Sequence, residues 1–500
     1  MATGPLSTRV ATLCDDAGQR VGPATAAQLL DVRRRLGEPL RVAIAGRLKA
    51  GKSTLVNALI GRRVAPTEVG ECTRIVTQFR YGTADRVDVV RRDGQRVSLP
   101  LDEAGMIPQR LNVPRSEISY VDVTLTSDHL RDLTVVDTPG LSSTNTLVSA
   151  GARRFLFNEA PIDDDLDEDS AGALSGAEAI VYVFTQSVRE DDVAALEAFR
   201  AVSARLASNP INSIGLFNKV DKLVGGGADP WPVAQPLAVD QAKVLRRVVS
   251  DVVPVVGLLA ETTEAGRLTA ADCEALRVLA RLPQDQRTVL LASVDLFTNR
   301  DCPVPREQRH RLLRLLDLYG IAFALAQLVA RPQLASGDLV RMLFQASGLL
   351  RLRQTLELAF HWRTDAIKAG WALSVLEKVA SAADRPFDRE LLRDAIERVL
   401  QEPEYHRLRL LEVAQQVTTG AVDLPDPMEQ ELTRLALSTD AAWILDQPAA
   451  TPEQLAQAAL EAATRWRVYA VAGASPAQSR VALVAHRGFY LLSQRVRAAQ

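Results

Sequence analysis

The chain has 500 residues, of which 47% are hydrophobic and 24% are charged, and its formal net charge is −2. This length exceeds what one ordinary hydrophobic core holds, so we expect two or three domains in a globular protein. A net charge near zero argues against a protein dedicated to nucleic acid, which needs a strongly positive surface.

The cysteines and the hydropathy pattern bear on the cellular compartment. Four cysteines (Cys14, Cys72, Cys273 and Cys302) lack CxxC spacing. This argues against a zinc site or a disulfide framework and favours a reducing cytoplasm. The sequence has no uninterrupted run of 18 apolar residues, so we expect any membrane association to be peripheral.

Residues 1–38 begin irregularly and then predict one amphipathic helix over 26–36, which Gly37 and Pro39 end. A single helix cannot bury its own apolar face. We therefore expect it to pack on a segment that is distant in the sequence.

Residues 41–54, RVAIAGRLKAGKST, predict a buried strand that turns through glycines into a helix and has the GxxxxGKS spacing of a phosphate-binding loop. Gly46 and Gly51 would let backbone N–H groups curl around phosphates. Lys52 would reach the outer phosphates, and Ser53 would ligate Mg²⁺. The alternative is a glycine-rich turn that binds nothing, which the flanking strand and helix disfavour. The other expected nucleotide contacts in this loop are Lys49, Ala50 and Thr54.

Thr73 comes just before a strand that we expect over 74–81. It is a candidate for the mobile threonine that closes on Mg²⁺ and the terminal phosphate, the alternative being an ordinary threonine at a strand start. The pattern then predicts a hairpin over 86–99, which turns at Asp93 and Gly94. Two further strands are expected over 118–125 and 133–136.

The last of these strands leads into VVDTPG. Asp137 at its carboxyl end would hold a Mg²⁺-bound water, and the Gly140 amide would meet the terminal phosphate. The predicted metal site therefore comprises Ser53, Thr73 and Asp137. The residue after the glycine is Leu141, where Ras-like enzymes place a glutamine that positions water. The attacking water must then be oriented by backbone, by another loop or by a second subunit.

Residues 142–176 are irregular, and we interpret the acidic run at 163–169 as a solvated loop and not as a metal site. A strand at 179–184 and a helix at 190–206 follow. The strand at 211–217 ends in NKVD.

The NKVD sequence indicates which base is bound. Asn218 would serve the N7 and O6 edge of guanine, Lys219 would lie along the ring, and Asp221 would accept hydrogen bonds from N1 and N2. Adenine lacks this pair of donors, so we expect GTP and not ATP. After a strand at 252–256, backbone amides around Gly257 would touch the base, although this signal is weaker.

Beyond residue 265 the pattern is helical and has no repeat of fixed period, which argues against a solenoid. The predicted fold is an α/β GTPase domain, with a mixed, mostly parallel sheet and helices on both faces, plus an elongated α-helical bundle attached to it. The expected helices cover 270–282, 306–318, 338–360, 371–382, 388–402, 405–417, 429–436, 452–468 and 478–499.

Several segments resemble bacterial dynamin-like GTPases, in particular the soluble C branch of the isoniazid-inducible type of actinobacteria. They are GRLKAGKSTLVNALIG, APTEVGECTR, VVDTPGL and FNKVD, followed by PVVGLLA, LLASVDLF and the stretch from Ser347. The resemblance extends to about residue 375. The last 125 residues share only helical character with the family.

The resemblance implies an N-terminal helix at 1–38 that contributes to the neck, a GTPase domain at 39–300 with its core at 40–262, and a helical neck and trunk at 301–500. It implies GTP hydrolysis to GDP and phosphate with Mg²⁺, through heads that pair across their nucleotides. That hydrolysis would be coupled to membrane remodelling or envelope maintenance. The implied partners are a second copy, a membrane-bound dynamin-like paralogue and an anionic membrane surface, with no nucleic acid. The implied location is cytoplasmic, with recruitment to the inner face of the cell membrane.

The phosphate loop departs from the animal dynamins, which carry a glutamine and a serine where this chain has Leu48 and Lys49. Leu48 cannot position water. Lys49 could supply the charge that a monovalent cation or an arginine finger provides elsewhere. Together with Lys49, the residues expected to act in catalysis are Lys52, Thr73 and Gly140.

No residue pattern locates a lipid-contacting element. Residues 443–445 or the turn at 417–427 could form an exposed tip, but an interior apolar face is favoured for both. The basic, amphipathic C-terminal helix is expected to pack in the bundle. A competing interpretation of the whole chain is a slow GTP-dependent switch or scaffold that regulates a division or envelope-stress assembly. A ribosome-associated GTPase is disfavoured, because no RNA-binding module is recognisable.

Overall fold

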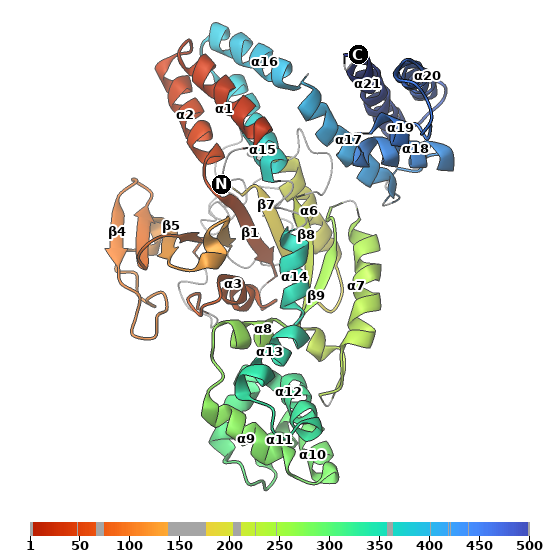
Figure 1. The fold of residues 1–500 in the computed structure, drawn as a ribbon. Coiled ribbons are helices and arrows are strands. Elements are labelled where there is room, and N and C mark those ends of the chain that lie inside the picture. Colours follow the sequence, from red (N-terminus) through yellow and green to blue (C-terminus); the bar gives the residue numbers. More distant parts are fainter. Residues whose placement is uncertain are drawn as a thin grey trace.

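The computed structural model describes residues 4–47, 49–66, 75–138, 177–203, 212–225, 227–246, 248–357, 364–400, 402–418, 420, 422–438 and 440–498. At its centre is a nine-stranded sheet in the order β4-β3-β5-β2-β6-β1-β7-β8-β9 (Figure 1). The strands are β1 Leu40–Gly46, β2 Thr77–Tyr81, β3 Arg86–Arg91, β4 Arg96–Leu99, β5 Ile118–Leu125, β6 Leu133–Asp137, β7 Ala179–Thr185, β8 Ser213–Asn218 and β9 Val252–Val255.

The sheet is mixed and mostly parallel, which confirms the predicted class. The strands β6, β1, β7, β8 and β9 form a parallel block. β2 joins this block antiparallel to β6, and β3 runs antiparallel to both β4 and β5. The expected hairpin is confirmed, with Gly94 in its turn at φ 86°. Because the strands of the parallel block all end at one edge, the loops after them meet there.

Alternate residues of the central strands feed two cores, one on each face of the sheet. Val42 and Ile44 face a core that contains α3 (Lys52–Ile60) and α14 (Leu349–Leu356). Ala43 and Ala45 face a second core, to which more helices contribute. That core includes α6 Glu190–Ser203, α7 Trp231–Leu245, α9 Ala270–Ala280, α10 Gln284–Leu291, α11 Val294–Asn299, α12 Arg306–Ala330 and α13 Ser336–Ala346.

Residues 306–356 pack with the sheet and not with the distal helices. Leu312, Leu316 and Leu343 lie in the same buried cluster as the strand residues Tyr182 and Phe184. The boundary that we expected at residue 300 therefore falls inside this core. Figure 1 shows α9 to α13 at the end of the sheet opposite α1 and α2.

Two of the helices in this region differ from the sequence prediction. The single helix expected over 338–360 is divided into α13 and α14 at Gly348. Gly348 has φ 79°, and an added Cβ at this residue would be 2.7 Å from the ring of Trp231. A side chain would not fit at this position, and glycine also adopts the positive φ that separates the two helices. α12 runs to Ala330 and not to 318, and it is kinked at Asp317, where φ is 51° and ψ is −177°.

Among the described residues, α12 is the one helix that is long and apolar enough to cross a membrane. It is not an uninterrupted apolar run, since Arg314 and Asp317 lie within it. Half of its most apolar window is buried, and Leu312, Leu315 and Leu328 belong to the core beside the sheet. These contacts are those of a core helix.

The N-terminus forms two helices, α1 (Pro5–Gly18) and α2 (Pro23–Leu36), where the sequence analysis expected one. The missed helix α1 buries Leu6, Val10 and Leu13 at helical spacing. Its partners are α2, α15 (Thr364–Ala382) and α16 (Pro386–Leu400). The prediction that this region packs on a distant segment is confirmed.

A carboxylate from a distant segment caps the N-terminus of α1, because the helix has no capping side chain of its own. Asp365 accepts hydrogen bonds from the backbone N–H groups of Leu6 (2.9 Å) and Ser7 (2.8 Å). These groups would otherwise be unpaired at the helix N-terminus. The N-terminal helix is thus joined to α15 by hydrogen bonds that no local pattern reveals.

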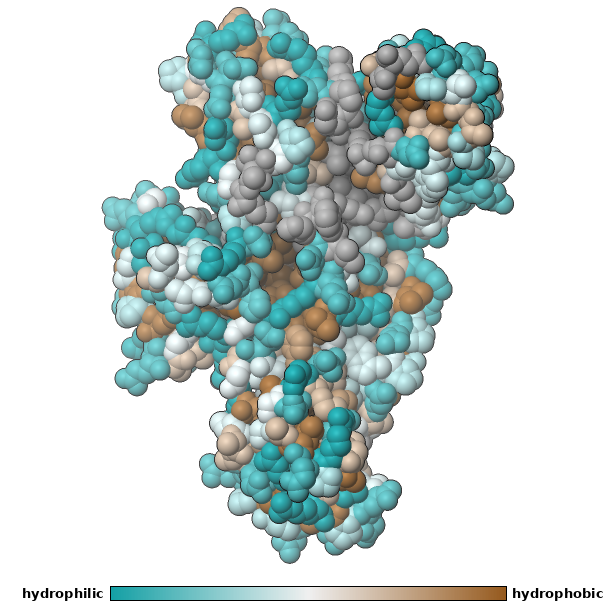
Figure 2. Space-filling model, in the orientation of Figure 1, coloured by the Kyte–Doolittle hydropathy of each residue, from teal (hydrophilic) through white to brown (hydrophobic). Residues whose placement is uncertain are grey.

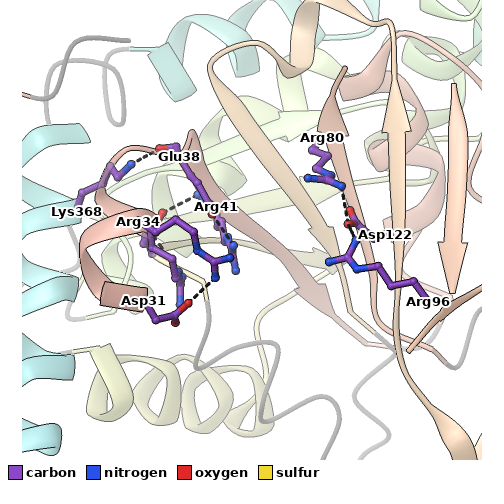
Figure 3. A network of polar contacts seen from close by, with 10 residues as sticks. Asp31, Arg34, Glu38, Arg41, Arg80, Arg96, Asp122 and Lys368 are labelled. Atoms are coloured by element: carbon purple, nitrogen blue, oxygen red, sulfur yellow. Dashed lines mark hydrogen bonds and ion pairs between the residues drawn. The ribbon is translucent and has the colours of Figure 1, made fainter. Parts of the chain in front are cut away.

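Polar contacts fix the junction between these helices and the sheet (Figure 3). Lys368 on α15 donates to the backbone carbonyl of Glu38, and Arg41 at the start of β1 contacts the Glu38 carboxylate at 2.6 Å. Figure 3 also shows Asp122 between Arg80 (2.9 Å) and Arg96 (3.1 Å). That buried carboxylate ties β5 to β2 and β4, and so it holds the antiparallel extension to the parallel block.

The C-terminal helices form a core of their own around Trp466 and Phe489. Ile444 and Val417 are buried as expected, but Trp443 is 49% exposed. The C-terminal helix packs on its neighbours in this unit, as predicted. The helices are α17 Pro403–Thr418, α18 Asp426–Leu437, α19 Ala441–Ile444, α20 Pro452–Val471 and α21 Pro476–Ala498.

Candidate functional site

The sequence motifs converge at the carboxyl edge of the parallel strands. Gly46 ends β1, Asp137 ends β6 and Asn218 ends β8. In the sheet register Ile44 of β1 lies beside Asp137, and Asn218 lies beside Val255, the last residue of β9. This edge, where loops follow parallel strands, is where α/β sheets bind ligands.

The two glycines of the phosphate-binding loop are needed for close packing as well as for backbone shape. Gly46 has φ 143°, and an added Cβ would be 2.1 Å from the Val183 carbonyl. Gly51 has φ 93°, and a Cβ there would be 2.4 Å from the Asn218 amide nitrogen. Lys49 also has a positive φ, 63°, and its side chain is exposed. A non-glycine residue in this conformation is strained, which is common at ligand-binding loops.

Lys52 lies inside the curve of the loop. It is 8% exposed, and its Nζ donates to the carbonyls of Gly46 and Arg47, both at 3.0 Å. Burial lowers the pKa of Lys52, and the nearby Asp137 opposes this effect. The ammonium is thus held at the loop by carbonyl oxygens, in a position from which it can pair with a phosphate.

The start of α3 offers free donors beside this lysine, since no side chain caps the helix at Gly51. Its first N–H groups and the positive end of its dipole suit a phosphate. Thr54 lies in this first turn and is half-buried. The predicted phosphate residues are therefore assembled around one helix N-terminus.

Ser53 and Asp137 are the two described residues that were predicted to bind Mg²⁺, and they lie next to each other. The Ser53 hydroxyl is 3.2 Å from Asp137 Oδ2, and Asp137 Oδ1 is buried without a hydrogen-bond partner among the described residues. Burial raises the pKa of Asp137 to about 6, although Lys52 and Ser53 lower it. A hydroxyl and a carboxylate with an unsatisfied oxygen are oxygen ligands of the kind that Mg²⁺ prefers. These residues fit the expected ion.

The loop expected to bind the base is tied directly to the phosphate loop. Asn218 Nδ2 donates to the Ala50 carbonyl at 2.8 Å, and Lys219 Nζ donates to the Lys49 carbonyl at 2.8 Å. Asn218 Oδ1 accepts from the Gly257 backbone N–H at 3.0 Å. Asn218 therefore joins three loops, in addition to the guanine contact predicted for it.

Asp221 sits in a short 3-10 turn, Val220–Lys222, next to these bonds. Burial raises its pKa, Lys222 lowers it, and the carboxylate of Asp317 raises it again. Its side chain is 9% exposed. A partly buried carboxylate of this kind suits a ligand that donates two N–H bonds.

Sequence reasoning missed two buried supports of the site. Arg47 in the phosphate loop donates its Nε to Asp192 of α6 at 2.7 Å, and Asp192, which is fully buried, also accepts from Tyr182 at 2.8 Å. Asn57 of α3 binds Glu261 at 2.8 Å. No local sequence pattern indicates either pair, because Arg47 and Asp192 are 145 residues apart and Asn57 and Glu261 are 204 residues apart.

Lys222 follows the predicted base-binding residue Asp221 directly in the sequence. Its Nζ is 2.5 Å from Asp317 and 4.0 Å from Asp221. Asp317 is the residue at the kink of α12, so this ion pair connects the loop expected to bind the base with that helix. We infer that Lys222 positions Asp221, and its charge lowers the pKa of that carboxyl group against the effect of burial.

Changing Lys222 to methionine should weaken GDP binding about three- to fivefold, because an exposed pair contributes at most about 1 kcal/mol. Binding of IDP, which lacks the 2-amino group that meets Asp221, should change less. Fluorescence competition would give both affinities. Lys243→Met is the matched control, since Lys243 pairs with Asp240 on α7. Equal losses for GDP and IDP would contradict the positioning role.

Two predicted site residues, Thr73 and Gly140, lie outside the described residues, and so do Leu48 and Leu141. Their roles stay predictions. The remaining predicted residues, including Gly257 at the start of α8 (Gly257–Glu264), all lie at this edge of the sheet or in the loops that follow it.

Comparison with known proteins gives three kinds of match. The family model described as "Dynamin family" matches residues 42–219. Isoniazid-induced protein IniC of Mycobacterium tuberculosis is 33% identical over 447 residues, which is 88% of this chain and 87% of that protein. Isoniazid-induced protein IniA of the same species is 32% identical over 122 residues, 23% of this chain and 19% of that protein.

Two further matches are shorter or more remote. Bacterial dynamin-like protein of Nostoc punctiforme is 30% identical over 117 residues, 21% of this chain and 17% of that protein. A solved structure, described as "An oligomerised bacterial dynamin pair provides a mechanism for the long range sensing and tethering of membranes", is 14% identical. It covers 98% of this chain and 90% of its own, with a TM-score of 0.36.

Proposed function

The chain belongs to the dynamin family as a bacterial dynamin-like GTPase, and from this premise we propose that it hydrolyses GTP to GDP and phosphate. Its heads would pair across their nucleotides to do so. Hydrolysis would be coupled to remodelling or maintenance of the cell envelope.

The bonds from Asn218 and Lys219 to the carbonyls of Ala50 and Lys49 carry this proposal. They join the residues that would bind guanine to the loop that would bind phosphate. A glycine-rich turn that bound nothing would have no need of a base-specific loop fastened to it at 2.8 Å. The arrangement therefore supports one ligand that carries both guanine and phosphates.

The residues of the site have distinct roles in this proposal. Lys52 and the first turn of α3 bind and orient the phosphates, and Asp221 selects guanine by accepting from N1 and N2. Mg²⁺, when bound at Ser53 and Asp137 with Thr73, would neutralise charge on the outer phosphates. Lys49 is exposed at the loop, where its ammonium can stabilise charge that develops as the bond to the terminal phosphate breaks.

The membrane part of the proposal rests on family membership. It places the protein in the cytoplasm, recruited to the inner face of the membrane by anionic lipid or by a membrane-bound dynamin-like paralogue. The partly exposed Trp443 on the C-terminal unit is a candidate contact, because tryptophan is favoured at membrane interfaces. Nucleic acid has no part in this proposal.

Steady-state GTP turnover per molecule, measured across protein concentrations with and without anionic liposomes, tests the proposal. We expect the specific rate to rise with concentration and with lipid, because pairing completes the site. Lys49→Ala should remove most of that rise, whereas Lys243→Ala, on the outside of α7, should keep it. A slow rate that stays flat under every condition would contradict hydrolysis by paired heads and favour a GTP-dependent switch.

A further inference from the structure

Arg47, the residue that follows Gly46 in the phosphate-binding loop, directs its guanidinium group to α6. Its Nε donates to Asp192 Oδ1 at 2.7 Å, and its Nη2 donates to Asp192 Oδ2. Two parallel bonds of this kind, which we call the Arg47–Asp192 fork, fix both the distance and the orientation of an arginine side chain. The loop is therefore anchored to the body of the domain at its first side chain.

Asp192 accepts hydrogen bonds on both of its carboxylate oxygens, and it is fully buried. Its Oδ1 also accepts from the Tyr182 hydroxyl at 2.8 Å, and its Oδ2 also accepts from the Arg189 backbone N–H at 2.8 Å. These two donors come from β7 and from the residue just before α6. A buried carboxylate that is bound at both oxygens is a firm support, and removal of its cation would leave an unpaired charge in the core.

The backbone of Arg47 contributes to the shape of the loop as well. Its carbonyl accepts from the Ala50 N–H at 3.2 Å and from Lys52 Nζ at 3.0 Å. Between these points Lys49 has φ 63°, which is unfavourable for a residue with a side chain. Lys219 Nζ holds the Lys49 carbonyl at 2.8 Å from the other side. The strained residue therefore lies between two anchors, and the Arg47 side chain supplies one of them.

A second buried pair has the same geometry but joins two helices. Arg311 on α12 donates its Nε to Asp272 Oδ1 at 2.8 Å and its Nη2 to Oδ2 at 3.0 Å, and the Asp272 side chain is fully buried. Asp272 lies on α9, in the lobe at the lower end of the molecule, whose surface is largely hydrophilic (Figure 2). This pair therefore shows what such a fork contributes to packing alone.

We propose that Arg47 is a positioning residue, whose fork on Asp192 holds the strained turn that presents Lys49 to the terminal phosphate. The loop then has its active shape before GTP binds, so no binding energy is spent on bending it. This inference rests on the proposed hydrolysis of GTP, in which Lys49 stabilises developing charge. Arg47 acts through the backbone of the loop and does not itself contact the ligand.

The variant Arg47→Gln tests this role through kcat and GDP affinity, measured on the same samples. We expect kcat at saturating GTP to fall roughly 10- to 100-fold, the scale of a catalytic group displaced by about 1 Å. The Kd for GDP should stay within about threefold, because Asp221, Lys52 and the start of α3 supply its contacts. Arg47→Lys keeps the charge but cannot form two parallel bonds, so its loss of kcat should be intermediate.

The matched control for loss of a buried arginine–aspartate pair is Arg311→Gln. Both glutamine variants should lower the thermal midpoint, because each leaves a buried carboxylate unpaired. Only Arg47→Gln should lower kcat, whereas Arg311→Gln should keep kcat within about twofold of the wild type. Losses of kcat of the same size in both variants would overturn the proposal, since activity would then simply follow stability.

The double variant Arg47→Gln with Asp192→Asn separates the fork from the stability of the fold. A neutral pair leaves no unpaired charge in the core, so the thermal midpoint should rise above that of Arg47→Gln alone. Glutamine is too short to restore the fork, so kcat should stay within about twofold of the Arg47→Gln value. Recovery of kcat together with the midpoint would overturn the proposal. A loss equal to the product of the two single losses would overturn it too, because Arg47 would then act independently of Asp192.

Failure of this inference can be told apart from failure of the proposed function. If the wild type hydrolyses GTP and Arg47→Gln matches its kcat, the positioning role is wrong while hydrolysis stands. If the turnover of the wild type itself stays flat as the protein concentration rises, hydrolysis by paired heads is wrong and the positioning role falls with it.

Discussion

Replacing Lys52 with methionine is expected to lower kcat/KM for GTP by at least about 100-fold, the scale of losing one donor to developing charge in a closed site. Lys52 is the buried cation of the phosphate loop, held by the carbonyls of Gly46 and Arg47. Methionine keeps the length and the apolar stem but removes the charge. The measurement is phosphate release under steady state, together with GDP affinity.

This result reports on function only if the Lys52→Met variant is still folded. Lysine buried at 8% exposure is costly to desolvate, so its removal should leave the thermal midpoint unchanged or higher. Lys378→Met, on α15 and away from the nucleotide site, is the control for loss of a lysine. Turnover that persists in Lys52→Met at more than a tenth of the wild-type rate would contradict the assignment of the loop.

Exchanging Asp221 for asparagine should change which base is bound. The carboxylate accepts two N–H bonds from guanine, and an amide would present its own N–H₂ to one of these donors. Sites that hydrogen-bond a substrate reject a mismatched analogue by about 10⁴- to 10⁵-fold, and we expect a loss of at least 10³-fold for GTP. The affinity for XTP, which carries a carbonyl where GTP has the 2-amino group, should rise in this variant.

Competition assays with GTP, XTP and ITP would measure this exchange. Asp317→Asn is the matched control, because Asp317 lies on the other side of Lys222 and has no direct contact with the base in this scheme. Its preference for GTP over XTP should persist. If Asp221→Asn binds GTP and XTP as the wild type does, Asp221 does not read the base.

The sheet and the grouping of the motifs at its edge could be predicted because their signals are local. Each strand of the parallel block is a short apolar run, and Gly46, Lys52 and Asp137 stand at fixed positions beside such runs. The spacing of a motif along the chain is enough to bring it to the edge of the sheet, whatever the distant residues are. For this reason the mixed sheet and the grouping of the motifs agreed with expectation.

The features that sequence analysis missed depend on partners far apart in the chain. α1 was missed although Leu6, Val10 and Leu13 stand at helical spacing, and the carboxylate that caps it, Asp365, lies 359 residues away from Leu6. The supports at Arg47 and Asn57 need buried carboxylates from α6 and α8, and the ring of Trp231 leaves no room for a side chain at Gly348, between α13 and α14. None of these contacts has a periodicity or a spacing that one segment could show.

The bond between Asp365 and the start of α1 has a consequence for synthesis of the chain on the ribosome. At about 5–20 residues per second, the 359 residues that separate the two partners take roughly 20 to 70 s to emerge. During that interval the apolar stripe of α1 and α2 has no α15 to cover it. A nascent chain of this protein therefore exposes an apolar N-terminal hairpin until the whole head has been made, which makes it a natural client for chaperones.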